Sequence, residues 1–192
     1  MKRWIVFTLL ILVCACALPP AGLTPSAPTL IPSKPNQLIP SGTVQNDLFQ
    51  FEITSGWKVK NGPLASGKNA WNYYNLNLEI LVQVYQDQYN AVLTVARREM
   101  PKGSSLGQEF TQTYTAIANQ IRNDQTSEGN MDGRKALVRS YERPWGEPWL
   151  RFRDVWIEKE GWIYVISLKS SLKPVSAELE LVEKVYTTFH LR

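Results

Sequence analysis

The chain has 192 residues, a formal net charge of +4 and a hydrophobic fraction of 44% that includes 7 Trp, 8 Tyr and 6 Phe. This length suits one ordinary domain with an appendage, and the apolar content can fill a core, which excludes a globally disordered chain. The only histidine is His190, and both cysteines fall within the first sixteen residues. The folded part therefore has no internal disulfide and lacks the ligands for Cys/His zinc sites and iron–sulfur clusters.

The first twenty residues have the build of an export signal. Lys2 and Arg3 precede an apolar run over residues 4–13, and Pro19 and Pro20 close the segment. The run is shorter than the roughly 20 residues that a membrane-spanning helix needs. A secretory signal is therefore expected, and it takes no part in the fold.

The end of this segment, Val13-Cys14-Ala15-Cys16, resembles a bacterial lipobox with Cys16 as the modified residue. The resemblance implies that residues 1–15 are a lipoprotein signal peptide, cleaved before a Cys16 that carries diacylglycerol. Two or three acyl chains attach a protein stably to a membrane, whereas one is marginal. An ordinary cleaved signal without lipid and a retained membrane anchor stay open as alternatives.

Cleavage would change the charge balance of the chain. Without Lys2 and Arg3, 19 of the 21 basic side chains remain with 17 acidic ones, which gives a net charge of +2. A nucleic-acid binder is expected to have a marked basic excess, so no nucleic-acid partner is predicted.

A proline-rich segment follows the signal. Residues 17–46 hold seven of the twelve prolines, which prevent helix or sheet from propagating. We expect residues 16–46 to be the acylated cysteine with a disordered stalk, about 90 Å long when fully extended. The folded domain is then expected to span residues 47–192.

The domain begins with strand patterns. Apolar and polar residues alternate over residues 49–53, and further strands are predicted over residues 57–60, 76–85 and 91–97. Later strands are predicted over residues 135–143, 149–158 and 162–168, with turns at Asp132-Gly133 and at residues 159–161.

Two helices are predicted from apolar residues at intervals of three and four. The first carries Leu106, Phe110, Tyr114, Ile117 and Ile121, is capped by Ser105 with Gln108, and ends by residues 123–124. The second carries Val175, Leu179, Val182, Tyr186 and Phe189. Near its end, Lys184, His190 and Arg192 are expected to complement the helix dipole.

Consecutive strands followed by a helix, twice over, predict an α+β fold with a central antiparallel sheet flanked by helices. This order resembles the PsbP-like α/β/α sandwich, which includes bacterial envelope lipoproteins of the DcrB type. The resemblance covers residues 47–192 and rests on five short matches: Gly56-Trp57, Leu106–Phe110, Gly133–Ala136, Gly161–Ile166 and Thr188-Phe189. It implies a binding or assembly role. No residue matches a metal or photosystem-contact motif of the plant relatives, so no metal and no cofactor is expected.

The sequence gives little support to an enzyme. His190 is the only imidazole, and no Gly-x-Ser-x-Gly nucleophile elbow is present. Asp154 and Glu158 share a strand face about 13 Å apart, too far for joint acid–base work. We therefore predict a protein that is not an enzyme. The alternative is an envelope hydrolase with an unrecognised carboxylate or Ser/Lys site.

Aromatic residues in turn-rich stretches are the main binding candidates. Trp145 and Trp149 bracket a Pro/Gly-rich loop close to Tyr141 and Arg143, and a second cluster holds Trp71 and Tyr73. Such residues offer flat, rigid contact area to sugars, acyl chains or proteins. We expect Trp145 at the loop's centre to be exposed. In the alternative, both loop tryptophans fold back and cap the core.

Arginines form a second candidate. Arg139, Arg143, Arg151 and Arg153 lie on neighbouring predicted strands and would make one basic patch if their faces coincide. The alternative is a solvated sheet face with cross-strand partners such as Glu142 and Glu158.

Together these features predict an exported protein, lipid-anchored with its domain on the extracytoplasmic side of a bacterial membrane. Its expected role is non-catalytic binding or assembly. The expected partners are the membrane, through the lipid, and an envelope protein, glycan or lipid ligand.

The anchor can be tested directly. Cys16→Ser should release the protein from membranes, because the acyl chains would be its strong hydrophobic attachment. Fractionation after an alkaline wash measures the release. If the variant stays in the pellet, the apolar run at residues 4–13 is itself the anchor.

Overall fold

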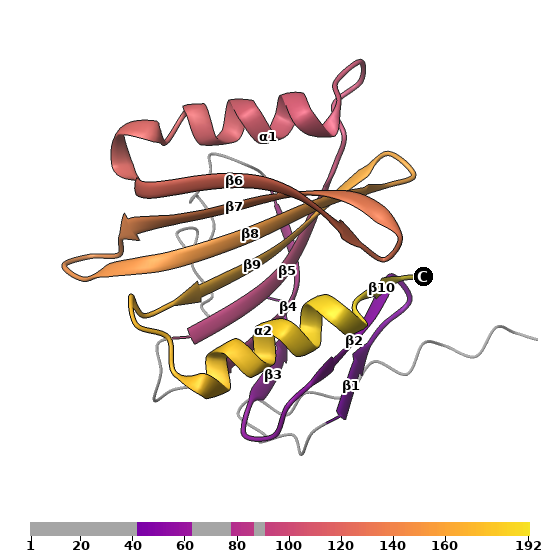
Figure 1. Cartoon of the computed structure of the whole chain (residues 1–192). Coiled ribbons are helices and arrows are strands. Elements are labelled where there is room, and N and C mark those ends of the chain that lie inside the picture. Colours follow the sequence, from indigo (N-terminus) through magenta and orange to yellow (C-terminus); the bar gives the residue numbers. More distant parts are fainter. Residues whose placement is uncertain (1–41, 63–77, 87–90) are drawn as a thin grey trace, which may run out of the picture.

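The computed structural model describes residues 42–62, 78–86 and 91–192 of the chain (Figure 1). The predicted α+β class is confirmed, because most of these residues lie in antiparallel sheets and two α-helices complete the fold. The elements in chain order are β1 (Gly42–Gln45), β2 (Phe49–Ile53), β3 (Lys58–Asn61), β4 (Glu79–Gln86), β5 (Ala91–Glu99), α1 (Leu106–Thr115), a 3-10 turn (Ala118–Gln120), β6 (Arg122–Met131), β7 (Arg134–Pro144), β8 (Trp149–Lys159), β9 (Trp162–Ser170), α2 (Ser176–Thr188) and β10 (His190–Leu191).

The strands form two sheets. A seven-stranded sheet has the order β3-β4-β5-β9-β8-β7-β6, and each neighbouring pair is antiparallel. A smaller sheet has the order β1-β2-β10. The predicted strand at residues 49–53 is confirmed, but it lies in this smaller sheet, which the sequence pattern did not reveal.

The large sheet is the middle of three layers. Figure 1 shows α1 over one face, and α2 with the small sheet over the other. Phe49, Phe51 and Phe189 stack on one another with ring-centroid distances of 5.7–6.0 Å, within the larger of two buried clusters. Phe110 and Tyr114 of α1 pack on the opposite face in the second cluster.

The folded region begins earlier than the predicted residue 47. Gly42–Gln45 pairs with β2, and the Val44 side chain is 4% exposed within the larger cluster. Residues 42–45, predicted as part of the stalk, therefore belong to the fold. The predicted signal peptide, Cys16 and the rest of the predicted stalk lie outside the described residues, as do Trp71 and Tyr73.

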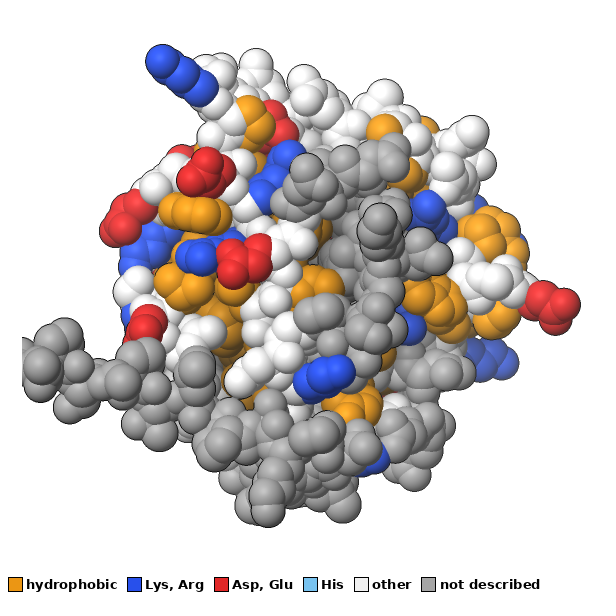
Figure 2. Space-filling model, turned by 180° about the vertical axis from the view of Figure 1, so that it is seen from behind, with side chains coloured by type: hydrophobic (Ala, Val, Ile, Leu, Met, Phe, Trp, Pro, Cys, Tyr) orange, Lys and Arg blue, Asp and Glu red, His pale blue; other side chains and the backbone are white. Residues whose placement is uncertain are grey.

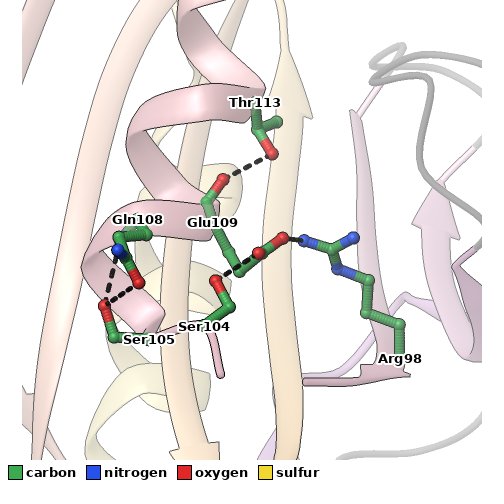
Figure 3. A network of polar contacts seen from close by, with 6 residues as sticks. All are labelled: Arg98, Ser104, Ser105, Gln108, Glu109 and Thr113. Atoms are coloured by element: carbon green, nitrogen blue, oxygen red, sulfur yellow. Dashed lines mark hydrogen bonds and ion pairs between the residues drawn. The ribbon is translucent and has the colours of Figure 1, made fainter. Parts of the chain in front are cut away.

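Helix α1 is shorter than predicted and begins with the predicted cap. The Ser105 hydroxyl oxygen accepts a hydrogen bond from the Gln108 backbone N–H at 3.3 Å. Glu109, in the first turn, is buried and accepts hydrogen bonds from Ser104 and from Arg98 of β5 (Figure 3). These contacts fasten the start of α1 to the sheet.

The chain leaves α1 for β6, a strand for which the sequence predicted no range. Of its ten residues only Met131 is buried. An edge strand paired on one side by its backbone needs no apolar face, so it leaves no alternating pattern to detect.

The two short turns are confirmed. Asp132 and Gly133 have φ values of 55° and 70°, and Glu160 and Gly161 have values of 52° and 78°. Positive φ at both central residues matches the right-handed twist of the strands that such turns join.

The predicted role of His190 at a helix end is wrong. Helix α2 ends at Thr188, with no basic residue in its last turn. Phe189 is extended, which brings its ring onto β2, and His190 enters β10. The His190 Nδ1 atom lies 2.8 Å from Asp132 Oδ1, so the histidine pairs with the β6–β7 turn instead.

The domain boundary leads to a stability prediction. A chain starting at residue 47 should melt several degrees below one starting at Gly42, because it loses β1 and the buried Val44 side chain. Burying such a side chain stabilises by about 1.5–3 kcal/mol, and 1 kcal/mol shifts Tm by roughly 2–4 °C at this size. Thermal unfolding of both truncations measures the difference. Equal Tm values would show that β1 contributes nothing.

Candidate functional site

The predicted aromatic loop is the four-residue connection between β7 and β8. The Trp145 backbone N–H donates to the Pro148 carbonyl at 2.8 Å, and Gly146 has a φ of 67°, so the loop closes on itself. Trp145 is 37% exposed at its tip, as its position in the loop predicts.

The buried side of the Trp145 indole contacts the α1 face of the sheet. Its ring centroid lies 6.5 Å from that of Phe152, and Lys169 Nζ lies 4.5 Å from the ring centroid. Burial lowers the pKa of Lys169. Trp145 therefore covers part of the sheet, as in the capping alternative, and also presents an exposed surface. Its orientation is fixed by these contacts.

The neighbouring candidates are more enclosed. Trp149 is half-buried, with the Arg122 guanidinium carbon 3.9 Å from its ring centroid. Arg143 is also half-buried and donates to Gln120 Oε1 at 2.5 Å. These contacts tie the loop to the residues that follow α1.

Tyr141 does not lie at the surface as a binding residue would. It is 1% exposed, and its hydroxyl donates to Asp154 Oδ2 at 3.0 Å. The alternation of β7 explains this position, because Tyr141 points toward α1 and into the second buried cluster.

Asp154 is the centre of a polar network that the sequence analysis did not identify. Its side chain is fully buried and accepts hydrogen bonds from Tyr114 at 2.6 Å, Tyr141 at 3.0 Å and Ser167 at 2.5 Å. The Trp156 indole N–H donates in turn to the Tyr114 hydroxyl at 3.0 Å. An acid amid the large apolar residues of one strand face was the available signal. A carboxyl enclosed in this way holds α1, β7, β8 and β9 together and does not reach a substrate.

The four arginines do not form one patch. Arg139 lies over the Tyr114 ring of α1 at 4.3 Å, whereas Arg153 lies over the Tyr186 ring of α2 at 5.1 Å. In the register, Arg153 pairs with Ser140 and not with Arg139, so the two arginine pairs point to opposite faces. The predicted single basic patch is therefore wrong.

Arg151 and Arg153 instead line a groove on the α2 face, with a cavity volume of about 520 Å³. Two cross-strand rows form its floor, Ser140–Arg153–Leu168 and Glu142–Arg151–Ser170. Its remaining lining comes from β6, from the end of β7 and from α2 with its preceding loop: Asn123, Asp124, Gln125, Tyr141, Pro174, Leu179 and Val182.

The charges in this groove are unevenly compensated. Glu142 Oε2 lies 2.9 Å from Arg122 Nε, and its Oε1 lies 3.8 Å from Arg151 Nη2. Burial opposes ionisation of Glu142, but hydrogen bonds from Asn123 and Arg122 prevail and lower its pKa. Arg153 has no ion-pair partner within the described ranges.

Exposed hydrophobic residues gather at the same end of the molecule. In the described part of the chain, the large hydrophobic side chains that are exposed are Trp145 at 37%, Val175 at 40% and Leu179 at 55%. They belong to the β7–β8 loop and to the start of α2, both at the left of Figure 1. From behind, Figure 2 shows hydrophobic and basic side chains at the right edge, over this hairpin, with an acidic side chain projecting among them. We call the β7–β8 loop, the β9–α2 connection, the first turns of α2 and the groove the hairpin end.

The described residues lack two further kinds of feature, a cluster of metal ligands and a membrane-spanning helix. They contain no group of three or more His, Cys, Asp or Glu side chains placed to hold a metal ion. No helix among them is both long enough and apolar enough to cross a membrane.

Trp145 and Trp156 offer a matched stability test. Trp145→Ala should lower the free energy of unfolding by about 1 kcal/mol or less, because the residue is partly exposed on a loop. Trp156→Ala should lower it by about 3–5 kcal/mol, because Trp156 is fully buried. Chemical denaturation separates the two. A loss at Trp145 as large as that at Trp156 would make Trp145 a core residue.

Comparisons with known proteins bear on the fold. No family model and no curated protein matches the chain. Among solved structures, cyanobacterial PsbP (CyanoP) from Synechocystis sp. PCC 6803 is 15% identical with a TM-score of 0.50, over 76% of this chain and 88% of that chain. LpqN from Mycobacterium tuberculosis, described as involved in cell envelope biogenesis, is 7% identical with a TM-score of 0.51, over 80% of this chain and 86% of that chain. At these identities the likeness shows the fold alone, which is PsbP-like as the sequence predicted.

Proposed function

We propose that the chain is an exported lipoprotein, anchored through Cys16, whose domain binds another cell-envelope protein through the hairpin end without catalysing a reaction. The observation that carries this proposal is that Trp145, Val175 and Leu179 are all exposed at one end of the domain, where Arg151 and Arg153 line the groove on the α2 side. Exposed hydrophobic residues that lie together mark interaction surfaces, whereas scattered ones need no explanation.

The residue types at the hairpin end favour a protein partner. Tryptophan and arginine are enriched among the residues that dominate binding energy at protein interfaces. Trp145 rests on Phe152 and Lys169, so binding would immobilise little additional side-chain freedom. We therefore assign Trp145 the role of anchor.

The position of the hairpin end supports the same reading. Figure 1 places β1, where the described chain begins, at the lower right, and the β7–β8 loop at the left. A stalk that joins the domain at Gly42 would leave the hairpin end free to meet a partner.

A non-catalytic role is supported by the polar network. Asp154, the most enclosed carboxyl group of the sheet, is surrounded by three hydroxyl donors and 0% exposed, so it is not placed to act on a substrate. The two structural neighbours are described by their fold or by envelope biogenesis, and neither description names a catalytic activity.

Site-specific photocrosslinking in cells tests the proposal. A photoreactive phenylalanine analogue is placed at Trp145 or at Leu179 in the full chain. Both positions should give the same discrete protein adduct, because a partner that covers this end of the domain would meet Trp145 on the α1 side of the sheet and Leu179 on the α2 side. Gln112, exposed on α1, is the matched control and should not give it.

The adduct decides among the ligand classes. A protein adduct shared by positions 145 and 179 and absent at 112 supports the proposal. Adducts containing only lipid or glycan, or equal protein adducts at all three positions, contradict it.

A further inference from the structure

The groove on the α2 face carries a more specific inference. We propose that it binds an extended acidic segment of the partner protein, with carboxylates at alternate residues facing Arg151 and Arg153. This inference rests on the proposed function, because it assigns the chemistry of the partner at the hairpin end.

The spacing of the arginines sets the spacing of the ligand's charges. Arg151 and Arg153 are alternate residues of β8, and both line the groove. Alternate residues of a strand share a face and lie about 6.6 Å apart along it. An extended peptide has the same period, so acidic residues at positions i and i+2 can face both guanidinium groups at once.

The two arginines can each accept an additional acidic partner. Arg153 has no acidic partner within the described residues, and its guanidinium lies 5.1 Å from the Tyr186 ring centroid, which limits its freedom. Arg151 lies 3.8 Å from Glu142, a carboxylate that already has a closer partner in Arg122 at 2.9 Å. Asp124, which also lines the groove, is paired with Arg139, so a carboxylate of the ligand would supply the acidic partner that Arg153 lacks.

The wall of the groove fits the intervening residues of the same ligand. Leu179 and Val182 of α2 line the side opposite the sheet, and Val175 is exposed one turn before Leu179. In an extended chain, successive side chains point to opposite sides. Acidic side chains directed at the sheet would thus alternate with apolar side chains directed at α2.

The shape of the site favours a peptide over a bilayer or a free phosphate. Part of its lining is recessed: Leu168 and Ser170 of the floor are 6% and 2% exposed, and Val182 of the wall is 7% exposed. A flat membrane surface does not reach side chains buried in a groove. A phosphate ion would meet the arginines but would leave the apolar wall uncovered.

Peptide binding tests the inference. The full chain is held in phosphatidylcholine nanodiscs, which carry no net charge. A blocked, fluorescently labelled Asp-Leu-Glu-Leu-Asp peptide is titrated by anisotropy against its neutral counterpart Asn-Leu-Gln-Leu-Asn. The acidic peptide should bind, and more weakly at high salt, because screening weakens ion pairs. The neutral peptide should bind at least tenfold more weakly.

Variants assign the binding to the groove. Arg153→Gln should raise the Kd of the acidic peptide about tenfold, equivalent to 1.4 kcal/mol. Arg153→Lys should retain most of the affinity, which separates loss of charge from loss of fold. Lys102→Gln makes the same charge change at an exposed residue before α1 and should leave the Kd unchanged.

Three outcomes overturn the inference. They are equal binding of both peptides, equal effects of Arg153→Gln and Lys102→Gln on the Kd, and Arg153-dependent binding of phosphatidylglycerol vesicles or inorganic phosphate without binding of the peptide.

The two experiments can fail separately. If the peptide does not bind but positions 145 and 179 share a protein adduct, the proposed docking function stands and the partner has a different chemistry. Failure of the crosslinking with retained peptide binding would instead count against Trp145 as the anchor.

Discussion

The β7–β8 loop and the groove of the hairpin end depend on a buried carboxyl group that lies on the α1 face of the sheet, behind the floor of the groove. Asp154 accepts hydrogen bonds from residues of α1, β7 and β9, and it is fully enclosed. A buried carboxyl without partners is strongly unfavourable, so the surrounding elements must keep the positions that supply its donors. Tyr114 brings the end of α1 to β8 in this way. The residues after α1 are then placed to hold the β7–β8 loop, through Gln120 with Arg143 and Arg122 with Trp149.

Asp154 also belongs to a polar row that crosses the sheet. The register aligns one residue from each of five neighbouring strands: Gln83, Thr94, Ser167, Asp154 and Arg139. Gln83 donates to Thr94 at 3.0 Å, and Arg139 pairs with Asp124 of β6 at the edge. A shift of any strand by one residue would turn its polar member toward the apolar α2 face. The row therefore specifies the register of the sheet, whereas the apolar clusters supply the driving force for burial.

The elements predicted correctly from the sequence are those with a local signal. The helices show apolar residues at intervals of three and four, the strands that bury one face show apolar residues at every second position, and the short turns contain a glycine. The small sheet was missed, since β10 has two residues and its partner β2 is remote in sequence. Strand β6 was missed because it has almost no buried residue. The helix-end role of His190 failed for a tertiary reason, the attraction of Phe189 to the phenylalanines of β2.

The candidate site shows where such reasoning reaches its limit. The exposure of Trp145 followed from its place between Pro144 and Gly146, whereas the burial of Tyr141 required the position of Asp154 on the neighbouring strand. The arginines of β7 and those of β8 point to opposite faces because the register pairs each one with a neighbour of the other strand's arginine. This register cannot be read from either strand alone. As a result one face carries a closed polar network and the other an open groove with uncompensated arginine. Exposed residues that line the groove, such as Arg151 and Arg153, take no part in this network and can change with little cost in stability. The PsbP-like fold is shared with proteins only 15% and 7% identical, and a fold does not by itself define what its surfaces bind.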